Sequence, residues 1–165
     1  MRSLGLDVGD KRTGVAISDP QGILATPLTV LASEDEDAVI DGILKLVEQY
    51  EAGRIVVGLP RRLNGELGEQ AGKVTAFTEN LSLRAKRSNL NQLDVQMWDE
   101  RLSTKAVERL MMETAGKGGK LRSRAKKKTK NHNSSAKATV DAMAAAFILQ
   151  GFLDSLGDKE QCQSI

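Results

Sequence analysis

The order of the predicted elements indicates an α/β fold with a mixed five-stranded sheet. An alternating apolar pattern around a turn predicts an antiparallel hairpin over residues 4–18. Helix-like and strand-like stretches then alternate over residues 33–100, which is typical of parallel strands joined by crossover helices. An alanine-rich apolar stretch over residues 134–156 predicts a closing helix. Together these observations predict an N-terminal antiparallel half, a parallel half, and helices on both faces of the sheet.

The composition predicts a single globular domain, residues 1–165. The chain is 40% hydrophobic and 28% charged, and its length allows a core without disulfides. Its one cysteine, Cys162, excludes an internal disulfide framework and fits a reducing compartment. We find no signal-peptide pattern and expect no apolar run long enough to cross a membrane. The sequence therefore predicts a cytoplasmic protein.

Asp7 is the first residue in the hairpin that a purely structural interpretation leaves unexplained. It lies in an apolar predicted strand, where a charge is costly unless it is paired or bound to a cation. Gly5 and Gly9 flank it and are expected to leave room for a phosphate or a metal. The alternative is a turn-capping aspartate, a role that suits Asp10 better. The functional interpretation is a strand carboxylate that binds Mg²⁺.

The middle of the chain predicts one edge strand and then alternating helices and strands. Residues 23–31 predict the third strand, in which Pro27 favours an edge position. A capping pattern from Ser33 predicts the start of a helix, and we expect Gly53 to end it. The later elements are predicted as a strand over 54–60, a helix over roughly 67–86, a polar connection over 84–93, a strand over 94–100, and a helix from Ser103 or Thr104 to about 115.

Asp141 is a second acid in an unexpected place. The spacing of Asp141, Ala145, Ile148 and Phe152 is four, three and four residues, so these residues share one face of the closing helix. A carboxylate in line with an apolar stripe is expected to face the sheet. The alternative is a helix buried so broadly that no stripe can be assigned, with Asp141 as an early-turn acid favoured by the helix dipole.

A third acid comes from the end of the later predicted strand. Asp99 and Glu100 are neighbours there, so one of them faces each side, and periodicity does not choose between them. The alternative is a pair of surface acids with Arg101 as their partner. With Asp7 and Asp141, one of the two would complete an oxygen site suited to one or two Mg²⁺ or Mn²⁺ ions. Such a site can activate water and stabilise the leaving oxygen of a phosphodiester.

Positive charge is concentrated in one segment of the chain. The net charge is +2, and residues 117–130 alone carry +8, which leaves −6 for the remainder. We expect a mobile loop over about 116–134 that holds a nucleic-acid backbone, and a polar tail from about 157. The alternative is a solvated segment without a specific partner. Because aromatic residues make up only 3% of the chain, we expect recognition of backbone and shape and not of bases.

Four motifs, in chain order, resemble the YqgF (RuvX) family. They are GLDVGDKRTGVA at 5–16, IVVGLP at 55–60, DERLST at 99–104 and VDAMAA at 140–145. The resemblance implies an RNase H-like fold related to that of the Holliday-junction resolvase RuvC. It also implies a bacterial cytoplasmic nuclease that processes the 5′ end of pre-16S rRNA, with resolution of branched DNA as the alternative.

The resemblance also implies roles for individual residues. It makes Asp7, Glu100 and Asp141 the catalytic and metal-binding acids, and so favours Glu100 over Asp99. Three basic residues match basic positions of the motifs, and we expect them to contact phosphate or to pair at strand ends. The expected nucleic-acid-binding set is Lys11, Arg12, Arg101, Lys120, Arg122, Arg124, Lys126, Lys127, Lys128 and Lys130.

Two other interpretations of the same residues stay open. The Asp-x-Gly hairpin also resembles the phosphate loop of the actin and sugar-kinase fold, which would make the protein a nucleotide binder. A non-catalytic RNA-binding module of the same fold is the second. For the nuclease we expect a nucleic-acid partner, RNA in preference to branched DNA, no membrane, and a monomer or weak homodimer.

Overall fold

A single mixed sheet organises the part of the chain that this computed structural model describes. Its strand order is β3-β2-β1-β4-β5. β1 (Arg2–Val8) lies in the middle, antiparallel to β2 (Arg12–Ser18) and parallel to β4 (Ala52–Leu59). β3 (Ala25–Ala32) and β5 (Asp94–Asp99) form the antiparallel and parallel edges. The predicted five-stranded mixed sheet is therefore confirmed. The residues described are 1–60, 68–99 and 133–162.

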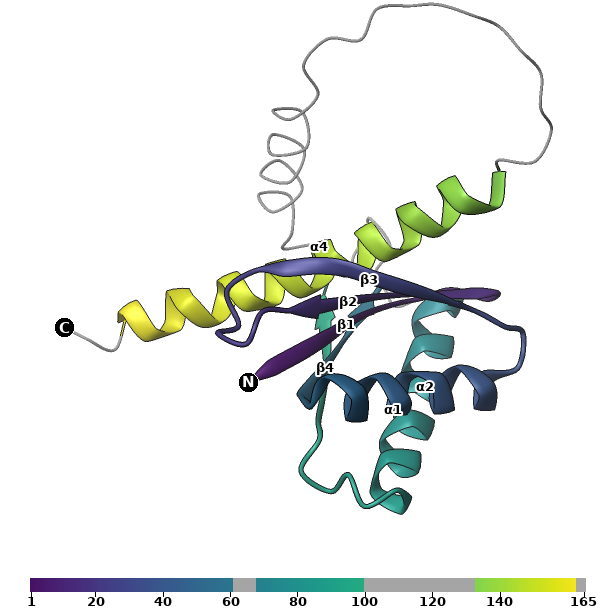
Figure 1. Cartoon of the computed structure of the whole chain (residues 1–165), viewed down its shortest axis with the longest axis horizontal. Coiled ribbons are helices and arrows are strands. Elements are labelled where there is room, and N and C mark those ends of the chain that lie inside the picture. Colours follow the sequence, from purple (N-terminus) through teal and green to yellow (C-terminus); the bar gives the residue numbers. More distant parts are fainter. Residues whose placement is uncertain (61–67, 100–132, 163–165) are drawn as a thin grey trace, which may run out of the picture.

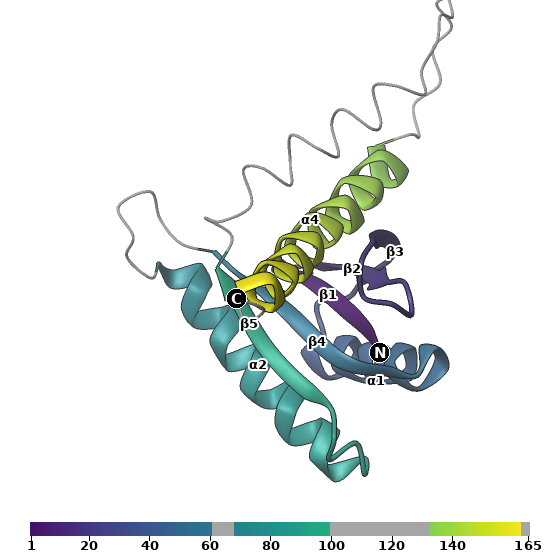
Figure 2. The same ribbon diagram turned by 90° about the vertical axis from the view of Figure 1, so that its left-hand side faces the viewer.

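Helices cover both faces of the sheet, as predicted (Figures 1 and 2). α1 (Glu36–Tyr50) and α2 (Glu69–Arg87) lie on one face, and α4 (Asn133–Cys162) crosses the other over β1, β2 and β3. Two apolar clusters separate the layers because side chains alternate along each strand. The larger cluster, beneath α1 and α2, includes Leu4, Leu6, Ile43, Ile55, Val57 and Leu81. The smaller, beneath α4, includes Ala16, Val56, Ala145, Leu149 and Phe152.

α4 packs very closely on the central strands. A Cβ atom at Gly5 of β1 would lie 2.6 Å from the Leu149 Cβ and 2.7 Å from the Ala145 main-chain oxygen. The side chain of Gln150 accepts a hydrogen bond from the Ala25 N–H at 2.9 Å and so ties α4 to the start of β3. The space at Gly5 that we expected a ligand to use is therefore taken by the helix.

The apolar character of α4 corrects one sequence-based expectation, the absence of any run long enough to cross a membrane. By length and composition alone, Val140–Gly157 could do so, with a mean hydropathy of 1.3 over 18 residues. In the described structure, Leu149 and Phe152 within it are buried against the sheet. Packing on the sheet is sufficient to account for the composition.

Several predicted boundaries were wrong for local reasons. α1 ends at Tyr50 because Glu51 adopts a left-handed φ of 53°, and its N–H donates to the main-chain oxygens of the last turn. Gly53, expected to end this helix, lies inside β4. The N-cap is Asp35, whose side chain accepts from the Asp37 N–H at 3.1 Å. Ser33 lies further out and accepts from the Asp35 N–H.

The later boundaries also differ from prediction. α2 continues to Arg87, so the connection to β5 begins later than residue 84. α4 begins at Asn133 and continues to Cys162, so residues 157–162 are helical and not the start of a polar tail. The helix predicted to end at about 115 lies outside the described residues, as does the expected loop except for its last two positions, which are helical.

Candidate active site

Asp7 lies near the C-terminal end of β1 on the face that α4 covers. Its neighbour Leu6 belongs to the opposite cluster, so alternation places Asp7 on the α4 side. Gly14 of β2 is its partner across the antiparallel ladder. The Asp7 carboxylate is half-buried. Because β1 lies between β2 and β4, neighbouring strands hold its backbone on both sides.

Asp141 reaches the same place from α4. A methyl group at Gly14 would overlap the main-chain oxygen of Asp141, so only glycine permits this contact between β2 and α4. This approach explains how two acids 134 positions apart in the sequence come together on one sheet face. The predicted helix face is confirmed, because its three apolar members are buried: Ala145, Ile148 and Phe152.

The electrostatics of this site disfavour two free negative charges. Burial raises the pKa of Asp7 above its ordinary value of 3.8, and the negative charge of Asp141 raises this pKa further. Carboxylate oxygens that repel each other in a partly dehydrated place are suited to a hard divalent cation, which would remove the repulsion. The donor set of Asp7 and Asp141 therefore fits Mg²⁺ or Mn²⁺.

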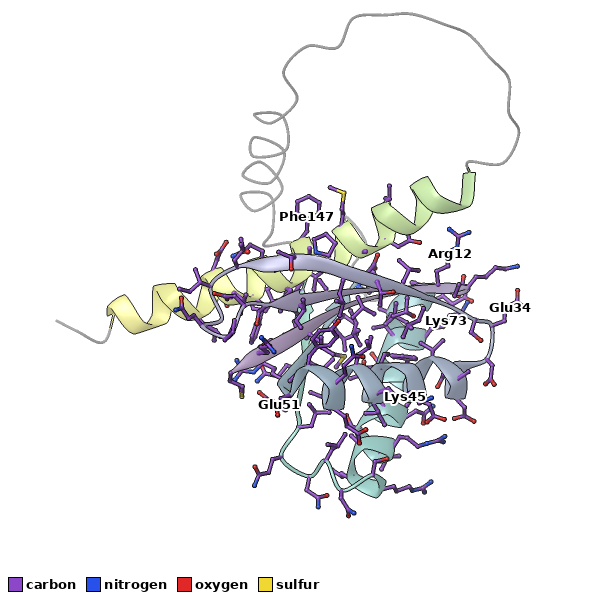
Figure 3. All side chains as sticks on the ribbon, in the orientation of Figure 1. Arg12, Glu34, Lys45, Glu51, Lys73 and Phe147 are labelled. Carbon is purple, nitrogen blue, oxygen red and sulfur yellow. The ribbon has the colours of Figure 1, made fainter. Side chains whose placement is uncertain are left out.

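Arg12 supplies the positive charge next to this pair. Its Nη1 lies 3.9 Å from the Asp141 Oδ2, with the two side chains 33% and 29% exposed. That separation is an ion pair but not a hydrogen bond. The same Nη1 is buried and has no hydrogen-bond partner in the described part of the chain. Figure 3 shows Arg12 at the same end of the molecule as Glu34, which precedes α1, and Lys73 of α2.

The other charged residues of the hairpin turn form ion pairs at the surface. The Lys11 Nζ lies 3.0 Å from the Glu34 Oε1, and the Lys73 Nζ of α2 lies 3.3 Å from the Asp10 Oδ1. All four side chains are more than half exposed, so these pairs contribute little to stability. Lys11, expected to contact phosphate, is thus paired with Glu34, and Asp10 is paired with Lys73 at the surface.

Gly9 has a structural role in the same turn. Its N–H donates to the Arg12 main-chain oxygen at 2.9 Å, and a Cβ atom at Gly9 would lie 2.9 Å from that oxygen. Gly9 therefore closes the turn, and neither it nor Gly5 shows the ligand space that we expected beside Asp7.

The predicted third acid lies just beyond the described part of the chain. β5 ends at Asp99, and its parallel pairing with β4 brings this end to the same edge of the sheet as the end of β1. Within the described residues, no three histidine, cysteine or acidic side chains form a metal-binding group. The predicted site residues outside the description are Glu100, Arg101, Lys120, Arg122, Arg124, Lys126, Lys127, Lys128 and Lys130.

Sequence reasoning missed an aromatic pair on the α4 side of the sheet. Trp98 of β5 packs edge-on against Phe152, with ring centroids 5.5 Å apart and an interplanar angle of 83°. Arg54 lies 5.3 Å over the Phe152 ring, and its Nε donates to the Asp94 Oδ2 at 2.8 Å. Strand alternation along residues 94–99 could have indicated that Asp94 and Trp98 share a face.

Two solved structures have a similar fold. The structure of Thermus thermophilus RuvC matches with a TM-score of 0.55 and 15% identity, covering 95% of this chain and 97% of that one. RuvC of the same organism in complex with a Holliday-junction substrate matches with a TM-score of 0.53 and covers 90% and 91%. At this identity the likeness concerns the fold alone. The chain thus has an α/β fold similar to that of RuvC, which is consistent with the predicted RNase H-like fold.

Sequence comparison then defines the family. The chain belongs to the RuvX family, described as Holliday junction resolvase, whose family model matches residues 1–155. A Bacillus thuringiensis (strain Al Hakam) relative is 45% identical over 157 residues, covering 94% of this chain and 99% of the relative. A Clostridium novyi (strain NT) relative is 42% identical over 156 residues, with 94% and 100% covered. Both carry the name "Putative pre-16S rRNA nuclease". The predicted family is confirmed.

Proposed function

We propose that this protein is a metal-dependent nuclease that hydrolyses phosphodiester bonds in structured nucleic acid. The observation that carries the proposal is the pair of acids, Asp7 and Asp141, that β1 and α4 bring together in a RuvC-like fold. The names of the relatives favour 5′-end processing of pre-16S rRNA as the reaction. The family description favours resolution of branched DNA as the second candidate.

The two acids would hold the metal, and we propose Glu100 as their third partner. When bound, Mg²⁺ or Mn²⁺ would supply an activated water and stabilise the leaving oxygen. Asp7 presents its oxygens from a central strand, and the contact at Gly14 sets the height of Asp141 above it. Because both supports are packed backbone elements, the oxygens are positioned before the substrate arrives.

Binding of the substrate is assigned to basic residues around these acids. Residues 117–130 carry +8 and follow Glu100 in the chain, so they are suited to neutralise a polyanion near the acids. We also propose phosphate contacts for Lys11, Arg12 and Arg101. A cytoplasmic location fits an rRNA precursor as substrate. A monomer or weak dimer would suffice for RNA, whereas cutting both strands of a junction requires two sites.

The first experiment compares two substrates and tests the acids directly. A 5′-extended small-subunit rRNA precursor and a four-way DNA junction are incubated with Mg²⁺, Mn²⁺ or EDTA. We expect metal-dependent cleavage of the RNA, and we expect Asp7→Asn and Asp141→Asn to lower its rate by on the order of 10²-fold or more, as the loss of an essential group does. Asp10→Asn is the matched control, since it removes an exposed acid from the same hairpin.

Each outcome of this experiment has a clear meaning. Cleavage of the junction alone would establish the nuclease and replace the RNA reaction by the second candidate. Binding of either substrate without cleavage in any metal would contradict the proposal and favour a non-catalytic binding module. Circular dichroism of the two site variants shows that a lost rate is not lost folding.

A further inference from the structure

Arg12 contacts the candidate site through an ion pair that is too long to be a hydrogen bond. Within the described residues its buried Nη1 has no hydrogen-bond partner, and the Asp141 Oδ2 with which it pairs lies 3.9 Å away. A guanidinium fixed for structural purposes usually makes short, paired hydrogen bonds to its carboxylate. The observed geometry neutralises Asp141 without using the hydrogen-bonding capacity of the guanidinium.

The side chain of Arg12 can change partner, whereas its main chain is fixed. Its main chain is held in the ladder opposite Ala32, and its carbonyl oxygen accepts the Gly9 N–H. Two other cations at this end of the described structure serve surface acids: Lys11 pairs with Glu34, and Lys73 pairs with Asp10. Arg12, in contrast, pairs with an acid of the site.

We propose that Arg12 is an exchangeable counter-ion of the site. In the metal-free protein its guanidinium neutralises Asp141. When a divalent cation takes the oxygens of Asp7 and Asp141, the guanidinium is released and donates its Nη1 hydrogens to a phosphate of the nucleic acid. The inference rests on the proposed function, because it concerns the same two acids.

The charges support this order of events. Asp7, Asp141 and Arg12 sum to −1 without metal and to +1 with one divalent ion. A third acid such as Glu100 lowers both sums by one, so in either case the metal changes the charge near Arg12 by +2 and reduces the repulsion of a phosphate. The planar guanidinium is the side chain best matched to phosphate oxygens. Metal binding and substrate binding would thus be coupled through one side chain, so that nucleic acid binds tightly only to the metal-loaded site.

Calorimetric titration with Mn²⁺ alone tests the exchange without measuring activity. We expect R12Q to bind Mn²⁺ roughly 2- to 10-fold more tightly than wild type, because the ion no longer competes with the guanidinium. K73Q is the matched control: it removes an exposed positive charge from the same end of the molecule, and its Mn²⁺ affinity should equal that of wild type. An equal gain in K73Q would mean that general charge, and not exchange at Asp141, is responsible.

A second measurement follows the substrate. In Ca²⁺, wild type should bind the rRNA precursor more tightly than in EDTA, and R12Q should lose most of this gain. If R12Q does not fold, the Nε–H resonance of Arg12 in ¹⁵N-labelled wild type replaces it, and this resonance should shift when Mg²⁺ is added. An unmoved resonance at saturating Mg²⁺ overturns the exchange.

The failures of the two proposals are distinguishable. If wild type binds no divalent ion, the metal site and the proposed function fail together. If wild type binds Mn²⁺ and R12Q binds it equally well, only the exchange by Arg12 fails. In that case Arg12 is a structural link between β2 and α4, and its loss should lower the melting temperature alone.

Discussion

At the scale of single residues, Asp7 links chemistry to stability. Its pKa is raised first by burial and then by the charge of Asp141, so the folded protein holds the Asp7 proton more tightly than the unfolded chain does. As pH rises from 3.8 through the raised pKa, the native state binds more protons than the unfolded state. The free energy of unfolding therefore falls across this window.

This sign leads to a prediction for Asp7→Asn. In EDTA at pH 7, we expect the variant to melt about 2–4 °C above wild type for each ~1 kcal/mol of relieved repulsion. The difference should shrink as the pH falls toward 3.8, where the Asp7 carboxyl becomes protonated in both states of wild type. Thermal unfolding between about pH 4 and 8 measures it.

Metal provides the control for that experiment. Saturating Mg²⁺ should raise the melting temperature of wild type and leave the variant nearly unchanged, because the ion relieves the repulsion only where both carboxylates are present. A melting-temperature difference that stays constant over the whole pH range would show that Asp7 is not the titrating group.

At the scale of elements, the packing of α4 on β2 decides whether a site exists. Gly5 and Gly14 allow the helix backbone to lie on the sheet, and the second of them touches the main chain of Asp141 itself. Backbone atoms cannot rotate away as a flexible side chain can. An added methyl group must therefore displace the helix and, with it, the carboxylate.

Gly14→Ala tests this packing. We expect a loss of about 1–3 kcal/mol in the free energy of unfolding, as overpacking produces, together with a fall in nuclease rate. Gly72→Ala is the matched control, because no atom of the described residues lies within 4 Å of a Cβ atom there and alanine favours the helix. Chemical denaturation of both variants gives the comparison, and equal stability of Gly14→Ala and wild type would refute the role of the close approach at Gly14.

At the scale of the whole molecule, opposite charges are separated along the chain. Residues 117–130 carry +8 and the remainder carries −6. An acidic body suited to cations and a basic segment suited to a polyanion are the charge distribution expected if different parts of the chain recognise the metal and the substrate.

Changing Lys126, Lys127 and Lys128 to glutamine tests this division. We expect weaker RNA binding, and a slope of log affinity against log salt that is smaller by roughly 0.7 for each phosphate that the protein no longer neutralises. The control triple lies on α1 and α2 and consists of the exposed residues Lys45, Lys73 and Lys86. Filter binding from about 50 to 300 mM salt measures both slopes, and an unchanged slope would remove the segment from substrate binding.

The larger part of the fold could be predicted from the sequence because it depends on local periodicity. Alternation in the hairpin and the edge position of Pro27 are each visible within a short window, and the structure confirms them. Helix ends were predicted less well. The end of α1 depends on the left-handed conformation of Glu51. Glycine is the residue that usually predicts this conformation at a helix end, and glutamate does not.

For the site, the sequence alone determined that Asp7 and Asp141 are acids in apolar settings, because a charge that breaks an apolar pattern is visible without coordinates. It did not determine what the neighbouring glycines do, nor that Arg12 faces Asp141. Those facts arise where α4 lies on β1 and β2, more than a hundred residues along the chain from the hairpin. Only tertiary packing brings such distant segments within a few ångströms, so only the folded structure decided which charges meet.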